Sequence, residues 1–193
     1  PYTTLFRSVF EEPNQFAECH ASTLEVLPNG DVVCAWFGGT TEGADDVNIW
    51  MSIRHEEKWS PPRKVVDVPG IPTWNPVLFM PDSSRLFADS SPRLLMFYRV
   101  GKKITEWQTY VIESTDGGHT WSDPKPLLDG CLGPIKNKPI VLTDSTWLAG
   151  SSVETEGEWY CQIERSIDQG ATWSIAQTLK LENHPKGIIQ PTI

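Results

Sequence analysis

The chain carries an eight-residue motif, Ser-x-Asp-x-Gly-x-Thr-Trp, in two complete copies at residues 114–121 and 166–173. A reduced third copy at 52–59 keeps only the Ser and the Trp. In this motif, the Asp-box, the Ser and Asp side chains can bind backbone amides across a turn, and the Gly permits a positive φ. The Trp can then pack between neighbouring sheets. The motif predicts a repeated, turn-rich β architecture and has no catalytic role of its own.

The Trp residues that close the three motifs, at positions 59, 121 and 173, lie 62 and 52 residues apart. This spacing suits four strands and a loop of variable length. The intervening segments are short, rich in β-branched and aromatic residues, and separated by Gly, Pro, Asn and Asp, as in antiparallel sheets. We therefore predict an all-β fold, a β-propeller with about three four-stranded blades. The predicted blades form one partial domain over residues 1–193 and cover roughly 18–68, 73–130 and 136–182, with the start of a fourth at 186–193.

Charge and composition exclude several kinds of partner. The chain has 16 basic and 25 acidic residues, a net charge of −9. Such a surface repels nucleic acid and anionic lipid, and no apolar run approaches the roughly 18 residues of a membrane span, so neither is a predicted partner. No Cys-x-x-Cys pair occurs, so no metal is predicted, and Cys34 and Cys161 are expected to be small buried hydrophobes. No cofactor is predicted, and compartment and oligomeric state stay open. Both ends look cut, so we expect a longer protein.

Each predicted blade opens with a polar residue followed by Ala or Pro. These openings are His20-Ala21, Asn75-Pro76, Lys138-Pro139 and Gln190-Pro191. Because the inner strands of a propeller converge on a central channel, we expect their polar side chains around one pocket. The predicted substrate-binding residues are His20, Trp74, Asn75, Arg99, Lys136, Lys138 and Gln190. The alternatives are an ordinary loop position for each, packing between blades for Trp74, and a solvated rim position for Arg99.

The loop after the second strand of the first predicted blade carries two adjacent carboxylates, Asp45 and Asp46. A glycosidase needs one carboxylic acid to protonate the leaving oxygen and a second group that acts as nucleophile or base. We predict Asp46 as the acid/base, with Asp45 as its neighbouring alternative. Glu154, at the end of the second strand of the third blade, is the predicted second carboxylate. The competing interpretation is that these Asp residues only stabilise a turn.

On these residues the chain resembles the non-viral sialidase family, neuraminidase-like proteins with BNR repeats. Residues 29–39, Asn-Gly-Asp-Val-Val-Cys-Ala-Trp-Phe-Gly-Gly, resemble the first-blade strand of that family, and residues 42–50 resemble the loop with its acid/base Asp. The resemblance implies a six-bladed propeller that cleaves terminal sialic acids with retention, using three Arg residues, a Tyr nucleophile assisted by a Glu, and an Asp. The chain departs from this pattern where the first Arg is expected, because His20 stands there.

We therefore predict a sialidase-like glycoside hydrolase, either an exo-α-sialidase or a related exo-glycosidase that removes an acidic or substituted terminal sugar from a glycan or oligosaccharide. The Tyr and the later Arg residues are expected after Ile193, so the isolated chain is expected to be inactive. The alternative is a non-catalytic Asp-box propeller that binds carbohydrate or protein.

Overall fold

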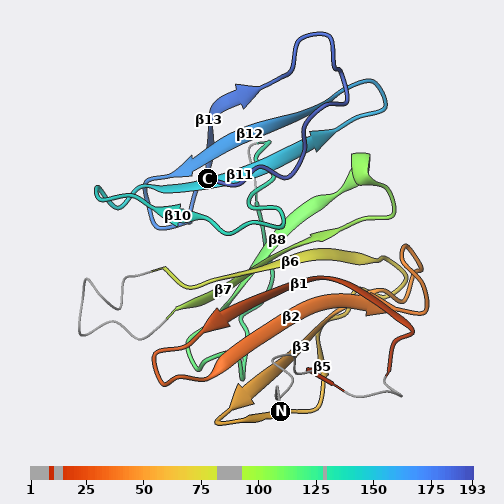
Figure 1. The fold of residues 1–193 in the computed structure, drawn as a ribbon, viewed down its shortest axis with the longest axis vertical. Helices are drawn as coiled ribbons and strands as arrows, with labels where there is room; N and C mark the ends of the chain where they lie inside the picture. The colour runs from red at the N-terminus through yellow and green to blue at the C-terminus, as the bar shows by residue number, and fades with distance from the viewer. Residues whose placement is uncertain (1–8, 11–14, 82–92, 128–129) are drawn as a thin grey trace, which may run out of the picture.

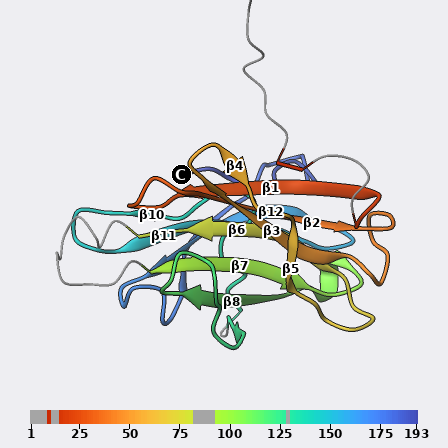
Figure 2. The ribbon, with the colours of Figure 1, turned by 90° about the horizontal axis from the view of Figure 1, so that it is seen from below.

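The computed structural model describes residues 9–10, 15–81, 93–127 and 130–193. These residues form three antiparallel sheets that follow one another along the chain and stack in that order (Figure 1). The strands of all three sheets run along one common direction, so their connecting loops collect at two opposite ends (Figure 2). The arrangement confirms the predicted all-β fold with about three blades of a propeller.

The first sheet contains β1 (Glu18–Val26), β2 (Val32–Gly39) and β3 (Asn48–His55) in chain order. Two short strands, β4 (Lys58–Trp59) and β5 (Arg63–Val66), both pair with β3. The reduced Asp-box lies here, at the turn from β3 into β4.

The second sheet has the order β6 (Thr73–Phe79), β7 (Leu94–Val100), β8 (Gln108–Ser114) and β9 (Lys125–Pro126). A short 3-10 helix, η1 (Ile104–Glu106), lies between β7 and β8. The third sheet has the order β10 (Ile140–Val141), β11 (Trp147–Glu154), β12 (Trp159–Ser166) and β13 (Ser174–Leu179). Among the described residues, no helix is long and apolar enough to cross a membrane.

Two apolar cores join the three sheets. One core packs side chains such as Ile49 and Met51 of the first sheet against Leu78 of the second, and all three side chains are fully buried. The other packs Phe97 of the second sheet against Trp147 of the third. Because neighbouring sheets cover both faces of β7, residues 94–98 of this strand are a continuous apolar run and not an alternating one. Each fully buried large side chain contributes roughly 1.5–3 kcal/mol of transfer free energy.

Both complete Asp-boxes close the turn after the third strand of their sheet. In the second copy, the amide of Gly170 donates to Ser166 Oγ at 2.8 Å, and the amide of Thr172 donates to Asp168 Oδ1 at 2.8 Å. Gly170 has a φ of +86°, which an L side chain rarely adopts. Trp173 is 7% exposed and belongs to the core between the second and third sheets. The Asp-boxes therefore stabilise turns and pack between sheets, as predicted, and they lie at the end of the sheets opposite η1.

Candidate functional site

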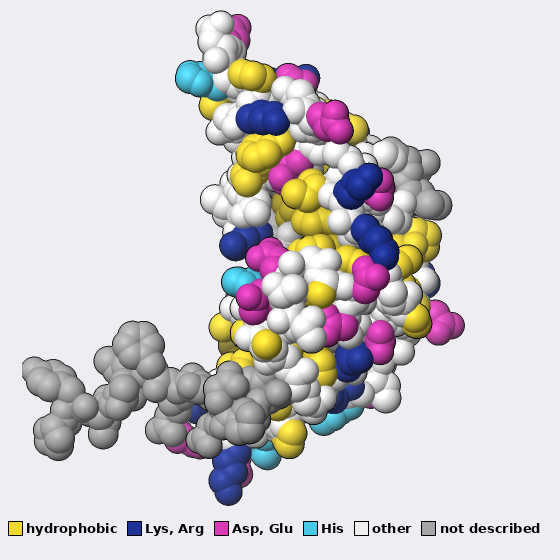
Figure 3. All heavy atoms as spheres, turned by 90° about the vertical axis from the view of Figure 1, so that its right-hand side faces the viewer, with side chains coloured by type: hydrophobic (Ala, Val, Ile, Leu, Met, Phe, Trp, Pro, Cys, Tyr) yellow, Lys and Arg dark blue, Asp and Glu magenta, His cyan; other side chains and the backbone are white. Residues whose placement is uncertain are grey.

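A cavity of about 430 Å³ opens at the end of the sheets that carries the loops β2–β3, β7–β8 and β11–β12. Figure 3 shows this end, where Lys and Arg side chains lie among Asp and Glu side chains and exposed apolar groups. The structure brings together here six of the ten residues predicted for the site. They are His20, Trp74, Asn75, Lys136, Glu154 and Gln190. The cavity is therefore the candidate functional site.

The backbone is irregular at several of the residues that line this cavity. The register of β1 with β2 breaks after His20, and the register of β6 with β7 breaks after Trp74. Such bulges bend a strand and redirect its side chains. The non-glycine residues with positive φ here are Ala21 (53°), Asn75 (43°), Lys136 (63°) and Gln190 (53°), and all four line the cavity. Strained backbone that recurs at one cavity supports a functional role for it.

Aromatic rings form one continuous wall of the cavity. The ring of Phe37 lies 5.7 Å from His20 and 5.4 Å from Trp74, and the ring of Trp107 lies 5.4 Å from Trp74. Trp74 is 8% exposed, and its indole N–H donates to the carbonyl oxygen of Gly101 at 2.8 Å. Trp74 therefore packs between the sheets and also lines the cavity, so the two interpretations of this residue coexist.

The two predicted aspartates lie in the β2–β3 loop but do not line the cavity. The Asp46 carboxylate accepts hydrogen bonds from the Thr40 amide at 3.2 Å and from Thr40 Oγ1 at 3.0 Å. Asp45 forms an ion pair with Lys102 at 2.8 Å. The catalytic roles of Asp46 and Asp45 stay predictions, and both side chains already stabilise the loop at the cavity mouth.

Glu42, in the same loop, lines the cavity and was not singled out in the sequence. Its Oε2 lies 3.8 Å from Nε2 of His20. Its amide donates to Glu18 Oε2 at 2.7 Å, and the Thr41 hydroxyl donates to the same atom at 3.0 Å. These hydrogen bonds lower the pKa of the Glu18 carboxyl and hold the loop in place. Only the loop position of Glu42, shared with Asp45 and Asp46, could have suggested it.

Glu154 ends β11 and reaches the cavity from the third sheet. Its burial raises the pKa of the carboxyl, while the positive charge of Arg99 opposes that rise. A carboxyl with a raised pKa keeps its proton over a wider pH range, which suits a proton donor. Of the three predicted catalytic residues, Glu154 is the one that lines the cavity.

Arg99 is the next-to-last residue of β7 and is not a solvated rim residue, because it is only 2% exposed. Burial lowers the pKa of its guanidinium to about 10. Arg99 lines a smaller chamber of about 130 Å³, which shares four lining residues with the main cavity. The shared residues are Ile104, Trp107, Ile135 and Glu154. The small chamber therefore adjoins the main cavity along these four residues.

Lys138 is not among the residues that line the cavity. Its Nζ donates to the carbonyl oxygen of Leu24 at 2.5 Å and contacts the Glu25 carboxylate. In the segment that leads into the third sheet, the positive-φ residue at the cavity is Lys136, two positions before Lys138. The Lys138-Pro139 pair therefore does not occupy the same structural position as the Asn75-Pro76 pair of the second sheet. Lys138 thus links the third blade to β1 of the first, and its substrate-binding role stays a prediction.

Gln190 is held at the cavity by backbone contacts. Its amide donates to Ser152 Oγ at 2.5 Å, and its carbonyl oxygen accepts from Asn137 Nδ2 at 3.0 Å. These bonds join the chain after β13 to the third sheet.

Across the described ranges, no group of three or more His, Cys, Asp or Glu could hold a metal ion.

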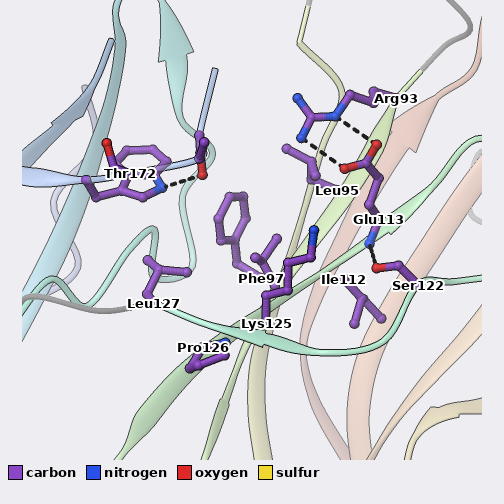
Figure 4. Close-up of a pocket in the computed structure, with 14 residues that line it drawn as sticks. Arg93, Leu95, Phe97, Ile112, Glu113, Ser122, Lys125, Pro126, Leu127 and Thr172 are labelled. Carbon is purple, nitrogen blue, oxygen red and sulfur yellow. Dashed lines mark hydrogen bonds and ion pairs between the residues drawn. The ribbon is translucent and has the colours of Figure 1, made fainter. Parts of the chain in front are cut away.

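A second cavity, of about 280 Å³, lies at the Asp-box end between the second and third sheets (Figure 4). There Arg93 faces Glu113 across two contacts, Nε to Oε1 and Nη2 to Oε2, each of 2.9 Å. Arg93 also donates to the carbonyl oxygen of Gln169 at 3.2 Å. The cavity contains none of the ten predicted site residues.

Comparison with known proteins supports the architecture. The model of a family described as BNR repeat-like domain matches residues 30–193. No curated protein has a sequence significantly similar to this one. The NanB sialidase from Streptococcus pneumoniae superposes with a TM-score of 0.65 at 11% identity, over 94% of this chain and 47% of that chain.

Two further solved structures are glycosidases of other specificities. The α-L-arabinofuranosidase Arb93A from Fusarium graminearum has a TM-score of 0.58 and 16% identity, over 82% of this chain and 47% of that chain. The α-L-arabinanase from Penicillium chrysogenum, solved with arabinobiose, has a TM-score of 0.54 and 18% identity, over 85% of this chain and 49% of that chain. The chain thus spans about half the length of these structures, and likeness at this level of identity establishes the fold, which it shares with glycosidases.

Proposed function

Because the chain belongs to the BNR repeat-like domain family, we propose that the whole protein is a sialidase-like glycoside hydrolase that binds a terminal sugar in the cavity described above. The main support for this proposal is that six predicted site residues, from segments of all three sheets, line one cavity. Such a concave site with a few converging polar groups and an aromatic wall suits a carbohydrate. An exo-α-sialidase and a related exo-glycosidase for another acidic or substituted sugar both fit this proposal.

In the proposed reaction, Glu154 is the proton donor to the leaving oxygen. Its pKa is raised by burial, and it stands at the cavity between the second and third sheets. A positioned acid of this kind accelerates glycoside cleavage by roughly 10²–10⁴-fold. The β2–β3 loop supplies the second carboxylate, Glu42, which lies at the cavity beside His20. Asp46, which the sequence predicts as the acid/base, is the alternative proton donor from the same loop.

The experiment is a screen of the whole protein against chromogenic glycosides, sialosides included, followed by Glu154→Gln, Glu42→Gln and Asp46→Asn on the best substrate. Asp45→Asn is the matched control for Asp46→Asn. We expect hydrolysis of at least one glycoside and its loss in Glu154→Gln. Wild-type turnover in Glu154→Gln removes the proposed proton donor, and wild-type turnover in Asp46→Asn removes Asp46 from the reaction.

A propeller that only binds carbohydrate or protein is the second candidate. One observation favours it: both Asp45 and Asp46 are engaged in contacts within the loop and with Lys102, not at the cavity. Sugar binding without hydrolysis of any glycoside in the screen would support this candidate over the hydrolase.

A further inference from the structure

The side chains that line the main cavity carry charges of both signs. Glu42 and Glu154 line it, and so do His20, Lys102 and Lys136. Figure 3 shows the same mixture on the surface of this end, where Lys and Arg side chains lie among Asp and Glu side chains. The charge of a ligand that suits the cavity therefore depends on how these groups pair with one another.

Two of the basic side chains at the cavity are already beside a carboxylate. Nζ of Lys102 lies 2.8 Å from Oδ1 of Asp45, and Nε2 of His20 lies 3.8 Å from Oε2 of Glu42. Glu18, whose carboxylate accepts a hydrogen bond from the Glu42 amide at 2.7 Å, adds another negative charge next to this second pair. Neither Lys102 nor His20 therefore offers a ligand an unopposed positive charge.

The guanidinium of Arg99 does not reverse this balance. Arg99 is 2% exposed and lines the smaller chamber, and no arginine is among the described residues that line the main cavity. The negative charges of Glu164, which is fully buried, and of Glu154 already stabilise the charge of Arg99. Lys136 is then the cation that lines the cavity without an ion pair among the described residues.

Around the cavity and the adjoining chamber, carboxylates outnumber the permanent cations. The cations are Arg99, Lys102 and Lys136, and the carboxylates are Glu18, Glu42, Asp45, Glu154 and Glu164. The carboxylates keep their majority even when Glu154 is protonated. The chain as a whole has a net charge of −9. A carboxylate on a ligand would thus enter a site without excess positive charge, where like charges repel one another.

The uncharged groups at the cavity suit the hydroxyl groups of a sugar. The side chains of Asn75 and Gln190 line the cavity, and neither has a hydrogen-bond partner among the described residues. An amide side chain both donates and accepts, as a hydroxyl does, and a carboxylate such as Glu42 accepts from a hydroxyl. Nζ of Lys136 can donate to a hydroxyl oxygen without a negative charge on the ligand. Hydrogen bonds can therefore hold a sugar here without an ion pair.

We propose that the main cavity binds an uncharged terminal sugar, whose hydroxyl groups are recognised by the carboxylate of Glu42 and the amides of Asn75 and Gln190. Of the acidic and substituted sugars that the proposed function admits, this assignment selects an uncharged one, and in this respect it rests on the proposed function. The carboxylates give the specificity, because they accept hydrogen bonds from hydroxyls and repel an acidic sugar.

The test is calorimetric titration of the whole protein with pairs of sugars that differ in charge. The pairs are glucose with glucuronate, galactose with galacturonate, and the methyl ester of N-acetylneuraminate with N-acetylneuraminate itself. We expect the uncharged member of at least one pair to bind, and to bind roughly tenfold more tightly than its acidic partner. Because salt screens repulsion between charges, this difference should shrink between about 0.05 M and about 0.5 M NaCl.

Three results overturn the inference. They are equal or tighter binding of the acidic sugars, a difference in affinity that salt does not change, and no binding of any uncharged sugar.

A charge variant locates the repulsion. Glu42→Gln removes one negative charge and keeps the size of the side chain, so we expect acidic sugars to gain roughly 3–10-fold in affinity. Glu113→Gln is the matched control, because it removes the same charge at the Asp-box end, where Glu113 pairs with Arg93. Thermal unfolding checks that both variants fold. An unchanged difference between acidic and uncharged sugars in folded Glu42→Gln, or an equal change in folded Glu113→Gln, contradicts selection by charge.

A second variant tests recognition of the hydroxyl groups. Asn75→Asp keeps the shape of the side chain and tolerates the φ of +43°, but it replaces the amide donors with a further carboxylate. We expect uncharged sugars to lose roughly 3–10-fold in affinity. Asn183→Asp is the control, since Asn183 also has a positive φ, of 63°, and does not line the cavity. Full affinity for uncharged sugars in folded Asn75→Asp contradicts recognition by the Asn75 amide.

The two proposals fail separately. Binding of uncharged sugars with no hydrolysis of any glycoside by the whole protein removes the enzyme and keeps the uncharged ligand. Hydrolysis confined to sialosides or uronides removes the uncharged ligand and keeps the hydrolase.

Discussion

The two ends of β7 carry two arginines in opposite situations. Arg93, just before the strand, is matched by the Glu113 carboxylate through two contacts of 2.9 Å and also donates to Gln169 (Figure 4). Arg99, near the far end, is almost fully buried and leaves Nε and Nη2 without acceptors among the described residues. Arg93 is thus paired with a carboxylate at one end of β7, whereas Arg99 near the other end keeps two unpaired N–H groups among the described residues.

The difference extends to the regions around the two arginines. At the Asp-box end, polar side chains bind the backbone of their own turn or a neighbouring side chain, as Asp168 binds Ser166 and Thr172. At the loop end, four non-glycine residues with positive φ line a cavity together with Glu154, whose pKa is raised by burial. The comparison teaches that the repeated motif stabilises the fold, while the ligand site consists of residues that depart from the repeat.

The largest expected effect tests the loop end. Glu154→Gln keeps the shape of the side chain but removes its titratable proton, so we expect hydrolysis by the whole protein to fall by roughly 100-fold or more. The measurement is turnover of the best glycoside from the screen. Because the change lies at the loop end, unfolding by urea should be close to wild type. A large loss of stability with unchanged turnover in Glu154→Gln would mean that the loop end stabilises the fold and does not take part in the reaction.

The next effect tests the Asp-box end. Asp168→Ala removes hydrogen bonds to Ser166 Oγ, to the Thr172 amide and to Thr172 Oγ1. At roughly 0.5–1.5 kcal/mol for each hydrogen bond, partly offset by water, we expect a loss of roughly 1–3 kcal/mol in the free energy of unfolding. Urea denaturation measures it. Turnover of the best glycoside by the folded whole protein should stay at the wild-type value, and a loss there would contradict the division between the two ends.

Acid should weaken the Asp-box end. Hydrogen bonds from Thr172 hold the pKa of Asp168 down to about 2, and those from Thr120 lower the pKa of Asp116. A carboxyl with a depressed folded-state pKa contributes stability above its unfolded pKa of about 3.9 and loses it as the pH falls toward the folded value. We expect the urea midpoint to fall between about pH 4 and pH 2, less so in Asp168→Asn. Equal acid sensitivity of wild type and Asp168→Asn would assign the effect to other groups.

A smaller effect is expected at Arg93. Arg93→Lys keeps the positive charge but loses the two-pronged contact with Glu113, whose side chain is 31% exposed. Partly exposed ion pairs contribute about 0.2–1 kcal/mol, so we expect a loss of stability within that range. Thermal unfolding measures this loss. A loss of glycoside turnover in Arg93→Lys as large as that of Glu154→Gln would break the comparison between the two ends of β7.

The smallest effect is expected at Asp45, which forms an exposed ion pair with Lys102 at the cavity mouth. Asp45→Asn should change the free energy of unfolding by no more than about 0.5 kcal/mol. Chemical denaturation checks stability, and turnover of the whole protein checks activity. A loss of turnover as large as that of Glu154→Gln would make Asp45, and not Glu154, the carboxylate of the reaction.

The repeat made most of the fold predictable, and the site only in part. The Asp-boxes mark equivalent positions in successive blades. Alignment of the blades on these boxes predicted His20, Asn75 and Gln190 as inner-strand residues, and all three line the cavity. The same alignment predicted Lys138 as a cavity residue, but its side chain contacts Glu25. The alignment failed there because the positive-φ residue at the cavity, Lys136, lies two positions earlier, in the segment before β10, and such an irregularity depends on tertiary contacts and not on the repeat.

Residues in the loops were harder to predict, because no periodicity acts on them. Trp107 follows η1, and nothing in its local sequence distinguishes it from the Trp residues of the core. Glu42 stands in a loop with Asp45 and Asp46, and only the folded loop shows that Glu42 faces the cavity. Arg99 could be read equally well as a rim residue until its burial beneath neighbouring sheets was known.

By itself, the sequence determined what depends on short-range chemistry: the turns of the Asp-boxes, the alternation of strands and turns, and the family to which the chain belongs. The tertiary structure alone decided what depends on groups brought together from distant positions. Whether an arginine is paired, as Arg93 is, or buried with free donors, as Arg99 is, depends on carboxylates and chambers contributed by other strands. Burial and electrostatic pairing are properties of that assembled environment, so no single stretch of sequence encodes them.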